Sequence, residues 1–416
     1  MQQFANKTDI TIKNSFEQIQ FIDWRTQPSN FKTYPNFFRR YLIDNYKELE
    51  FIKNFGKITS RKKYGKEEVS LRTNPSAGGL YPCEIYIQIR ALKGFLSGIY
   101  HYEPLSNTLC LIHELSDDGL EYYFDETSSK KFIILISNVY FRSSWKYGNR
   151  AIRYLLLDTG HQLGSILTSL KIEGLDFTLN FDFDKKRLND EFSFTSQEFF
   201  QCAILVDNQK DTKPKKLREK PVGVCPTDYF IKNSFIEEFI EKLNKEPFNI
   251  KNNPTFLQDI SKDQIQIAIN KRRSVRAFKK EPISKGEFDF ITNNLFDISK
   301  EFGIEIFYIN NNIEGIEKGV YKNVTLLKKG DFKKIGMELA FNQKLGSDSC
   351  FTLIYTSKDK NYIKTSIFSA FFAHLINLRA THLDISSSGI GAYFDDKTQK
   401  FLDTNNNILY LQVVGR

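Results

Sequence analysis

The stretch GFLSGIYHY at 94–102 occurs a second time in altered form, as GIEKGVYKN at 315–323. Both copies have the form Gly-x-x-x-Gly-[Ile/Val]-Tyr, and their tyrosines, Tyr100 and Tyr321, are separated by 221 residues (321 − 100). Similarity at a fixed offset within one chain is the signature of a repeated structural unit. The chain is therefore expected to contain two copies of one fold.

The elements around the two motifs recur in the same order. An apolar strand precedes each motif, a second strand follows it, and then come a long helix with apolar periodicity and a closing strand. The corresponding pairs are 84–89 and 304–309, 131–137 and 351–357, about 150–172 and about 363–382, and 202–207 and 409–414. Strands that are not separated one by one by helices predict an α+β fold rather than a uniform βαβ fold.

A proline-containing stretch separates the two copies. Its prolines are Pro214, Pro221, Pro226, Pro247 and Pro254. Prolines punctuate regular structure, so we predict one domain at 1–207, a linker at 208–259 and a second domain at 260–416. Two copies of a fold in one chain predict an intramolecular pseudo-dimer with one two-fold interface, whose two sites are free to diverge.

Composition places the chain among globular proteins. Of its 416 residues, 41% are hydrophobic and 26% are charged, which supplies apolar material for two cores and excludes a disordered or fibrous chain. No stretch reaches the roughly 18 apolar residues of a membrane span. The polar start MQQFANKTDI also lacks the apolar core of a signal peptide.

The cysteines indicate a reducing compartment. They occur singly, at Cys83, Cys110, Cys202, Cys225 and Cys350, with no spacing typical of zinc or redox sites. Free thiols in the cytoplasm are therefore expected. The five histidines are equally scattered, so no metal site is predicted.

The net charge of +9 is compatible with nucleic acid, an anionic cofactor or an acidic peptide as partner. The lysines alternate with acids along the whole chain, and the densest basic run, KDTKPKKLREK at 210–220, itself contains two acids. A solvated linker explains this run better than a nucleic-acid site does. Alternatively, this run binds an acidic leader peptide through Lys213, Lys215 and Lys216.

The second copy opens with an arginine-rich run. INKRRSVRAF at 269–278 follows the helical pattern DQIQIAI and contains Arg272, Arg273, Ser274 and Arg276. Guanidinium groups and a hydroxyl at this spacing suit bidentate recognition of a phosphate. A solvated basic helix end is the equally good structural explanation. The first copy has SRKKYG at 60–65, which keeps the charge and loses the pattern.

The first copy has a small-residue loop instead, within SLRTNPSAGGLYPCEIY at 70–86. Pro75 fixes a turn, and Ser76, Ala77, Gly78 and Gly79 allow backbone N–H groups to approach a flat ligand closely. An ordinary glycine–proline loop is the alternative. The second copy has only FDISKEFG before its strand at 304–309. One composite site built from both copies would survive such divergence.

A Lys-Tyr pair lies just before the long helix of the first copy, in YFRSSWKYGNRAIRY at 140–154. Lys146 and Tyr147 offer two proton-transfer groups, and a buried ligand beside them would make them an acid–base pair. A surface lysine next to a core tyrosine is the alternative. Asp158 and His161, at i and i+3, are more simply explained as a polar pair within the helix.

These motifs together resemble the nitroreductase-like flavoprotein superfamily. The resembling residues are Asn74 to Pro82, Gly98 to Tyr102, Trp145-Lys146-Tyr147 and Arg150. The run Arg272–Arg276 is similar to the superfamily's Arg-Arg-Ser-x-Arg phosphate motif. The resemblance covers 20–207 and 260–416, and its nearest branch is the SagB-type dehydrogenases, which include azoline dehydrogenases of thiazole/oxazole-modified peptide biosynthesis.

The resemblance implies two tandem nitroreductase-like domains, each with a central, mainly antiparallel sheet flanked by helices, with FMN at their interface. The flavin phosphate would meet Arg272, Arg273, Ser274, Arg276 and the terminal Arg416, and the ring edge would meet Pro75, Ser76, Ala77 and Gly78 from the other copy. In the loop 383–394, Gly391 and Ala392 match a backbone contact near the ring. Many classical nitroreductases have Glu where this chain has Gly391, and this departure favours the SagB-type branch.

The resemblance further implies that Lys146 and Tyr147 are the catalytic acid–base pair. The expected activity is FMN-dependent oxidation of thiazoline or oxazoline rings to thiazole or oxazole in a modified peptide, with a cyclodehydratase complex as candidate partner. The arginine run and the loop each occur once, so one FMN per chain is expected. No Gly-x-Gly-x-x-Gly follows a strand, so oxygen or another acceptor would close the cycle.

Three other interpretations stay open. An FMN enzyme could act on a small metabolite, a nonribosomal intermediate or a dehydroamino acid, because a fold does not fix a substrate. A non-catalytic docking subunit would be colourless. A nucleic-acid binder, for which no recognition motif accompanies the charge, would bind in a salt-sensitive manner.

Overall fold

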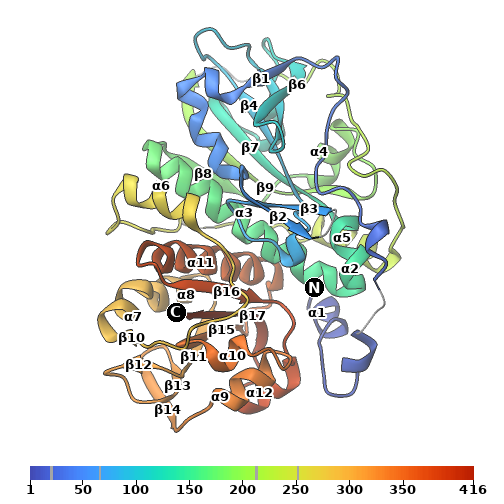
Figure 1. Cartoon of the computed structure of the whole chain (residues 1–416). Coiled ribbons are helices and arrows are strands. Elements are labelled where there is room, and N and C mark those ends of the chain that lie inside the picture. The colour runs from blue at the N-terminus through green and yellow to red at the C-terminus, as the bar shows by residue number, and fades with distance from the viewer. Residues whose placement is uncertain (19–21, 65–66, 211–213, 251–252) are drawn as a thin grey trace. The chain divides into compact units, whose positions relative to one another are not determined.

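The computed structural model describes residues 1–18, 22–64, 67–210, 214–250 and 253–416 (Figure 1). The chain forms two compact units. The N-terminal unit is Asp23–Asn253, and the C-terminal unit combines Met1–Ile22 with Pro254–Arg416. Each unit has its own sheet and its own hydrophobic core.

The N-terminal unit is built on an antiparallel sheet of seven strands in the order β1-β6-β5-β4-β7-β9-β8. Its strands are β1 (Arg40–Leu42), β4 (Cys83–Ile89), β5 (Gly98–Glu103), β6 (Thr108–Glu114), β7 (Ser129–Val139), β8 (Phe177–Asn180) and β9 (Glu198–Lys210). Strands β2 (Ile58–Tyr64) and β3 (Glu67–Arg72) pair antiparallel in a separate two-stranded sheet. The predicted strands at 84–89, 131–137 and 202–207 are confirmed as parts of β4, β7 and β9.

One long helix, α3 (Ala151–Glu173), packs against β4 and β7 of this sheet. Its residues from Ala151 to Leu170 are all buried, including polar ones such as Asp158 and Gln162. The shorter helices are α2 (Tyr140–Tyr147), α4 (Lys185–Glu191) and α5 (Ser234–Leu243), and a 3₁₀ segment, η4 (Lys47–Phe55), also packs on α3.

The C-terminal unit has an antiparallel sheet of six strands in the order β14-β13-β11-β15-β17-β16. Its strands are β11 (Glu305–Asn310), β13 (Gly319–Lys322), β14 (Thr325–Lys329), β15 (Phe351–Ser357), β16 (Ser386–Ile390) and β17 (Asn407–Gly415). Two short strands, β10 (Ile283–Ser284) and β12 (Ile313–Glu314), pair in parallel beside it.

Helices cover both faces of this second sheet. The long helix α11 (Tyr362–His382) lies on one face, where Gln412 of β17 donates a hydrogen bond of 2.8 Å to the carbonyl of Ala373. The neighbours Leu411 and Val413 point to the opposite face, into a core that includes Leu339. The other helices are α1 (Gln2–Lys7), α6 (Lys262–Lys271), α7 (Lys285–Ile291), α8 (Leu295–Glu301), α9 (Lys333–Leu339), α10 (Leu345–Asp348) and α12 (Asp395–Leu402).

The predicted repeat is confirmed by the topology. Strands β6, β5, β4, β7, β9 and β8 of one sheet match β14, β13, β11, β15, β17 and β16 of the other, in the same order. Gly98 pairs with Ile89 and Gly319 pairs with Asn310, so the motif has the same register in both sheets. The α+β fold with two tandem units is therefore as expected from the sequence.

The boundaries of the two units differ from the domain boundaries predicted at 207 and 260. Residues from the chain's start pack in the C-terminal unit, because the N–H of Ile10 donates to Asp395 (2.8 Å) and the N–H of Asp395 donates to the carbonyl of Ile10 (2.8 Å). Most of the predicted linker belongs to the N-terminal unit. In it, Asn233 caps helix α5, and β9 extends to Lys210.

The basic run at 210–220 is described in part, since 211–213, including Lys213, lie outside the described residues. Lys215 forms an ion pair of 2.7 Å with Asp117, and Lys216 forms one of 2.7 Å with Glu191. These lysines therefore already have acidic partners in their own unit.

All five cysteines are free thiols, as predicted. Among the described residues, no helix combines the length and the apolar character that a bilayer crossing requires.

Candidate functional site

The small-residue loop is fastened to helix α3. The Oγ of Ser76 donates a hydrogen bond of 2.7 Å to Oδ2 of Asp158, and the N–H of Ala77 donates one of 3.1 Å to Oδ1. One turn further along the helix, Gln162 accepts a hydrogen bond of 3.1 Å from the amide of Asn74. Two polar side chains of a single rigid helix thus fix the conformation of the loop.

The same loop touches the Lys-Tyr pair at Gly78. Gly78 has a φ of +65°, and a Cβ atom on it would lie 2.6 Å from the phenolic oxygen of Tyr147 and 3.2 Å from Nζ of Lys146. Only glycine fits this conformation and this closeness without strain. The structure therefore brings together two motifs that are about 70 residues apart in the sequence, both within the N-terminal unit.

Aromatic rings surround the Lys-Tyr pair at the end of helix α2. Nζ of Lys146 lies 4.9 Å from the ring centre of Trp24 and 5.5 Å from that of Tyr147. The ring of Tyr147 packs on Tyr154 of α3 at 4.2 Å, and the indole N–H of Trp145 donates a hydrogen bond of 2.9 Å to Thr26. Cation–π contacts of this kind fix the position of an ammonium group over the rings.

Asp158 is the site residue that the sequence interpretation missed, because i,i+3 spacing pointed to a pair within the helix. Its carboxylate instead accepts two hydrogen bonds from the loop. Burial raises the pKa of Asp158 to about 7, although the hydrogen bonds from Ser76 and Ala77 act to lower it. Because the loop that contacts Asp158 is distant from it in the sequence, no pattern of neighbouring residues indicates this role.

A buried ion network holds the far end of the loop. Arg142 of α2 forms an ion pair of 2.6 Å with Glu84 of β4 and donates a hydrogen bond of 2.9 Å to the carbonyl of Tyr81. His101 contacts the other oxygen of Glu84 at 2.8 Å. Burial raises the pKa of Glu84, but Arg142 and His101 outweigh it and hold this pKa at about 2.

The arginine-rich run lies beside strand β16 of the C-terminal unit. Arg272 follows helix α6 directly, and Ser274 forms a parallel bridge with Ser387. Next to it, Oγ of Ser388 donates a hydrogen bond of 2.8 Å to the carbonyl of Val275. The run is therefore an extended segment along the sheet edge, on which Arg272 is buried, Arg273 is half-buried, and Ser274 and Arg276 are exposed.

Gly391 and Ala392 follow the end of the same strand. The carbonyl of Ala392 accepts a hydrogen bond of 3.3 Å from Gln343. Gly391 lies four residue steps of extended chain beyond Ser387, which corresponds to about 13 Å. The two predicted contact regions of this unit thus lie at the two ends of β16.

The terminal Arg416 is engaged elsewhere. Its guanidinium forms an ion pair with Glu287 of α7 and donates a hydrogen bond of 3.0 Å to the carbonyl of Pro282. A role of Arg416 at a phosphate would require its guanidinium to exchange or share this ion pair.

The two long helices show how the copies have diverged. The backbone hydrogen bonds that close them correspond at an offset of 210 residues (385 − 175). At this offset Phe368 takes the place of Asp158, and Phe372 takes the place of Gln162. Phe368 stacks on Phe302 at 4.3 Å, where the N-terminal unit has the small-residue loop. The C-terminal copy has lost both the acid and the loop.

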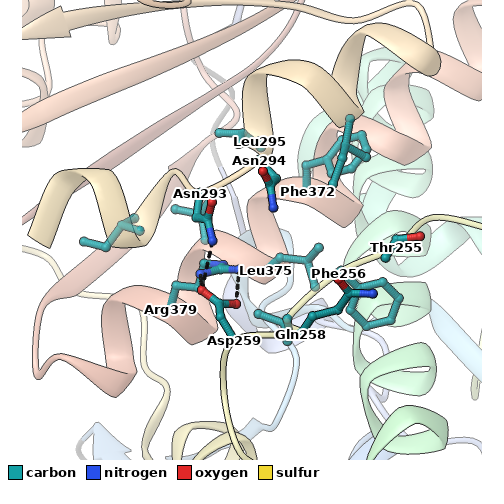
Figure 2. Close-up of a pocket in the computed structure, with 14 residues that line it drawn as sticks. Thr255, Phe256, Gln258, Asp259, Asn293, Asn294, Leu295, Phe372, Leu375 and Arg379 are labelled. Carbon is teal, nitrogen blue, oxygen red and sulfur yellow. Dashed lines mark hydrogen bonds and ion pairs between the residues drawn. The ribbon is translucent and has the colours of Figure 1, made fainter. Parts of the chain in front are cut away.

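A separate cavity of about 280 Å³ lies within the C-terminal unit, between α11, the α7–α8 connection and the segment 255–259 (Figure 2). Arg379 lies in its wall and forms an ion pair of 2.7 Å with Asp259, to which Asn293 also donates a hydrogen bond. The wall contains none of the predicted site residues. The cavity is therefore distinct from the candidate site.

Comparison with known proteins gives a fold and one partial sequence relative. No protein-family model matches the chain. Over 101 residues, or 23% of the chain, it is 33% identical to a Methanocaldococcus jannaschii protein provisionally named a nitroreductase. The match spans half the length of that relative.

The whole chain is similar in structure to a solved protein of Anabaena variabilis, also provisionally described as a nitroreductase. The TM-score is 0.82 at 22% identity, covering 100% of this chain and 99% of that chain. A chain of the E. coli microcin synthetase McbBCD complex, solved with truncated pro-MccB17 bound, matches 50% of this chain and 86% of its own length, at 16% identity and a TM-score of 0.33. The first likeness confirms the nitroreductase-like fold, and the second is too weak to add to it.

Proposed function

We propose that this protein is an FMN-dependent oxidoreductase that oxidises azoline rings of a modified peptide to azoles. The observation that carries the proposal is the contact of Gly78 with Lys146 and Tyr147. It joins a loop suited to a flat ligand with two groups suited to proton transfer. The provisional names of the Methanocaldococcus jannaschii and Anabaena variabilis proteins also favour an oxidoreductase.

The side-chain and backbone groups of the predicted site residues are of the kinds that bind FMN. The run Arg272 to Arg276 offers guanidinium groups and a hydroxyl, the donor set that a phosphate requires. At Gly78 the backbone comes closer to its neighbours than any side chain would allow, which suits contact with a flat ring. In this proposal Pro75, Ser76, Ala77 and Gly78 meet the ring edge, and Gly391 and Ala392 supply a backbone contact to the ring.

The phosphate would be held by Arg272, Arg273, Ser274 and Arg276, with Arg416 in support. These residues belong to the C-terminal unit, whereas the loop belongs to the N-terminal unit. The C-terminal copy has Phe368 and Phe302 where the other copy has its acid and its loop. We therefore expect one FMN per chain.

The chain's own groups would manage the proton. Oxidation of a thiazoline or oxazoline removes one proton and one hydride from adjacent ring atoms. A bound flavin supplies the hydride acceptor. The neutral amine of Lys146 would accept the proton at Nζ. The hydroxyl of Tyr147 would orient the azoline ring or relay the proton. Trp24 and Tyr154 keep the two groups in place through ring contacts.

The test begins with a visible absorption spectrum and quantitation of released flavin. About one FMN per chain is the expected ratio, because the arginine run and the loop each occur once, and two FMN per chain would contradict the proposal. A colourless protein that fails to bind added FMN would favour the docking-subunit interpretation.

The catalytic assignment is tested next with azoline-containing peptides, with and without a cyclodehydratase. Lys146→Ala is expected to keep its flavin and lose at least a hundredfold in turnover. Lys186→Ala, at an exposed lysine of the same unit, is the matched control and should behave as the wild type. A fully active Lys146→Ala protein would end the assignment of Lys146 as the base.

A further inference from the structure

We propose that Asp158 is a positioning residue that makes cofactor binding by the loop dependent on pH, an inference that rests on the proposed FMN site. In its ionised form Asp158 holds the loop in the conformation described above. When its carboxylate is protonated, one of the two loop contacts is lost and the loop binds the flavin less tightly.

The hydrogen-bond directions carry the argument. Each oxygen of Asp158 receives one donor, the hydroxyl of Ser76 at 2.7 Å and the N–H of Ala77 at 3.1 Å. A carboxylate accepts both, whereas a carboxylic acid must donate from one of its oxygens. Oγ of Ser76 is itself an acceptor for the N–H of Tyr81, at 2.9 Å. A proton on Oδ2 therefore competes with the hydroxyl of Ser76, and a proton on Oδ1 competes with the N–H of Ala77, so that one of the two contacts weakens when Asp158 is protonated.

The surroundings of Asp158 bring its titration near neutral pH. The side chain is 2% exposed, and burial raises its pKa to about 7. The titratable or charged groups on the elements around it are Tyr154 and His161 on α3, Cys83 on β4, and Lys146 and Tyr147 on α2 across Gly78. The next contact between the loop and α3, from Asn74 to Gln162, joins two neutral amides.

The effect reaches the cofactor through residues next to one another in sequence. Ser76 and Ala77, which Asp158 holds, directly precede Gly78, which rests on Lys146 and Tyr147. A rearrangement at Ser76 therefore changes both the proposed ring contact and its distance from the proton-transfer groups. The C-terminal copy, which lacks the loop, has Phe368 in place of the acid.

The test measures FMN affinity of the full chain from quenching of flavin fluorescence between pH 6 and pH 8. Wild-type affinity is expected to fall about tenfold between one pH unit above and one below the midpoint near pH 7. Asp158→Asn should bind at the weakened level throughout. A phosphate monoester also titrates near pH 6, so the quantity compared is the ratio of wild-type to Asp158→Asn affinity at each pH.

Two further variants sharpen the test. Ser76→Ala removes a hydrogen bond that lowers the pKa of Asp158, so its affinity midpoint should move to higher pH; this keeps the proposal testable if Asp158→Asn does not fold. Asp176→Asn, at an exposed acid near the end of the same helix, should keep the wild-type profile.

The outcomes separate the two proposals. A wild-type protein that binds no FMN at any pH overturns the proposed function itself. A wild-type protein that binds FMN with the same pH profile as Asp158→Asn, or a Ser76→Ala midpoint that does not rise, overturns the role of Asp158 and leaves the proposed function intact.

Discussion

The phenolic oxygen of Tyr147 lies 2.6 Å from the place that a Cβ atom would take on Gly78. Gly78→Ala is therefore expected to displace the Lys-Tyr pair as well as to strain the loop. Gly79 has a similar φ of +70° with nothing within 4 Å of such an atom, so Gly79→Ala is the matched control. Both substitutions should cost about 1–2 kcal/mol of stability through the positive φ.

Only Gly78→Ala should also reduce turnover, by tenfold or more, because only it moves groups that handle the proton. Thermal unfolding and steady-state rates of the two variants make the comparison. Equal losses of turnover would show that backbone strain, and not the contact with Tyr147, limits the loop.

The arginine run predicts a phosphate-specific effect. Arg276 is exposed on the segment that lies along β16, and loss of a charge-assisted hydrogen bond costs about 1.5–3 kcal/mol. Arg276→Gln should thus weaken FMN binding by roughly 10- to 100-fold and leave the binding of riboflavin, which has no phosphate, unchanged. Lys279→Gln, at a nearby exposed cation, should alter neither. Parallel losses for FMN and riboflavin would place Arg276 away from the phosphate.

The repeat could be predicted from the sequence because its motif has a local structural cause. The hydroxyl of Tyr100 donates to the carbonyl of Leu96 (2.6 Å), and that of Tyr321 donates to the carbonyl of Glu317 (2.7 Å), four residues back in each case. In both sheets a bulge lies directly before the tyrosine. Such features depend on neighbours in sequence, so they leave a visible pattern.

The parts that could not be predicted depend on distant residues. Asp158 gains its role from Ser76, 82 residues away, and Ile10 finds its partner at Asp395, 385 residues away. The side chain of Arg416 forms an ion pair with Glu287, which no sequence motif indicates. Periodicity identifies the elements and the loop, whereas these pairings arise only when the elements pack.

The buried pair of Glu84 and Arg142 predicts a pH-dependent stability. Glu84→Gln leaves the Arg142 guanidinium buried with a neutral partner, which costs about 3–5 kcal/mol. Since the pKa of Glu84 is lowered from 4.5 to about 2, its contribution is present above pH 4.5 and is lost as the pH falls toward 2. The difference between wild type and variant in urea unfolding should accordingly shrink from pH 7 to pH 3. A difference that stays constant would mean that the ionised carboxylate is not the source of the stability.

The two hydrogen bonds between Ile10 and Asp395 predict that the start of the chain stabilises the C-terminal unit. Asp395→Ala removes a buried acceptor at the start of α12 and leaves the N–H of Ile10 without it, which should cost about 1–3 kcal/mol. Asp396→Ala removes a contact of 3.4 Å from the N–H of Ile12 and a hydrogen bond of 2.7 Å from the adjacent N–H of Lys397, and should cost less than Asp395→Ala because Asp396 is only half-buried. Hydrogen exchange would locate the effect: Asp395→Ala should accelerate exchange in β15 and β17 and leave β4 and β7 unchanged. Acceleration in β4 and β7 alone would instead assign the start of the chain to the N-terminal unit.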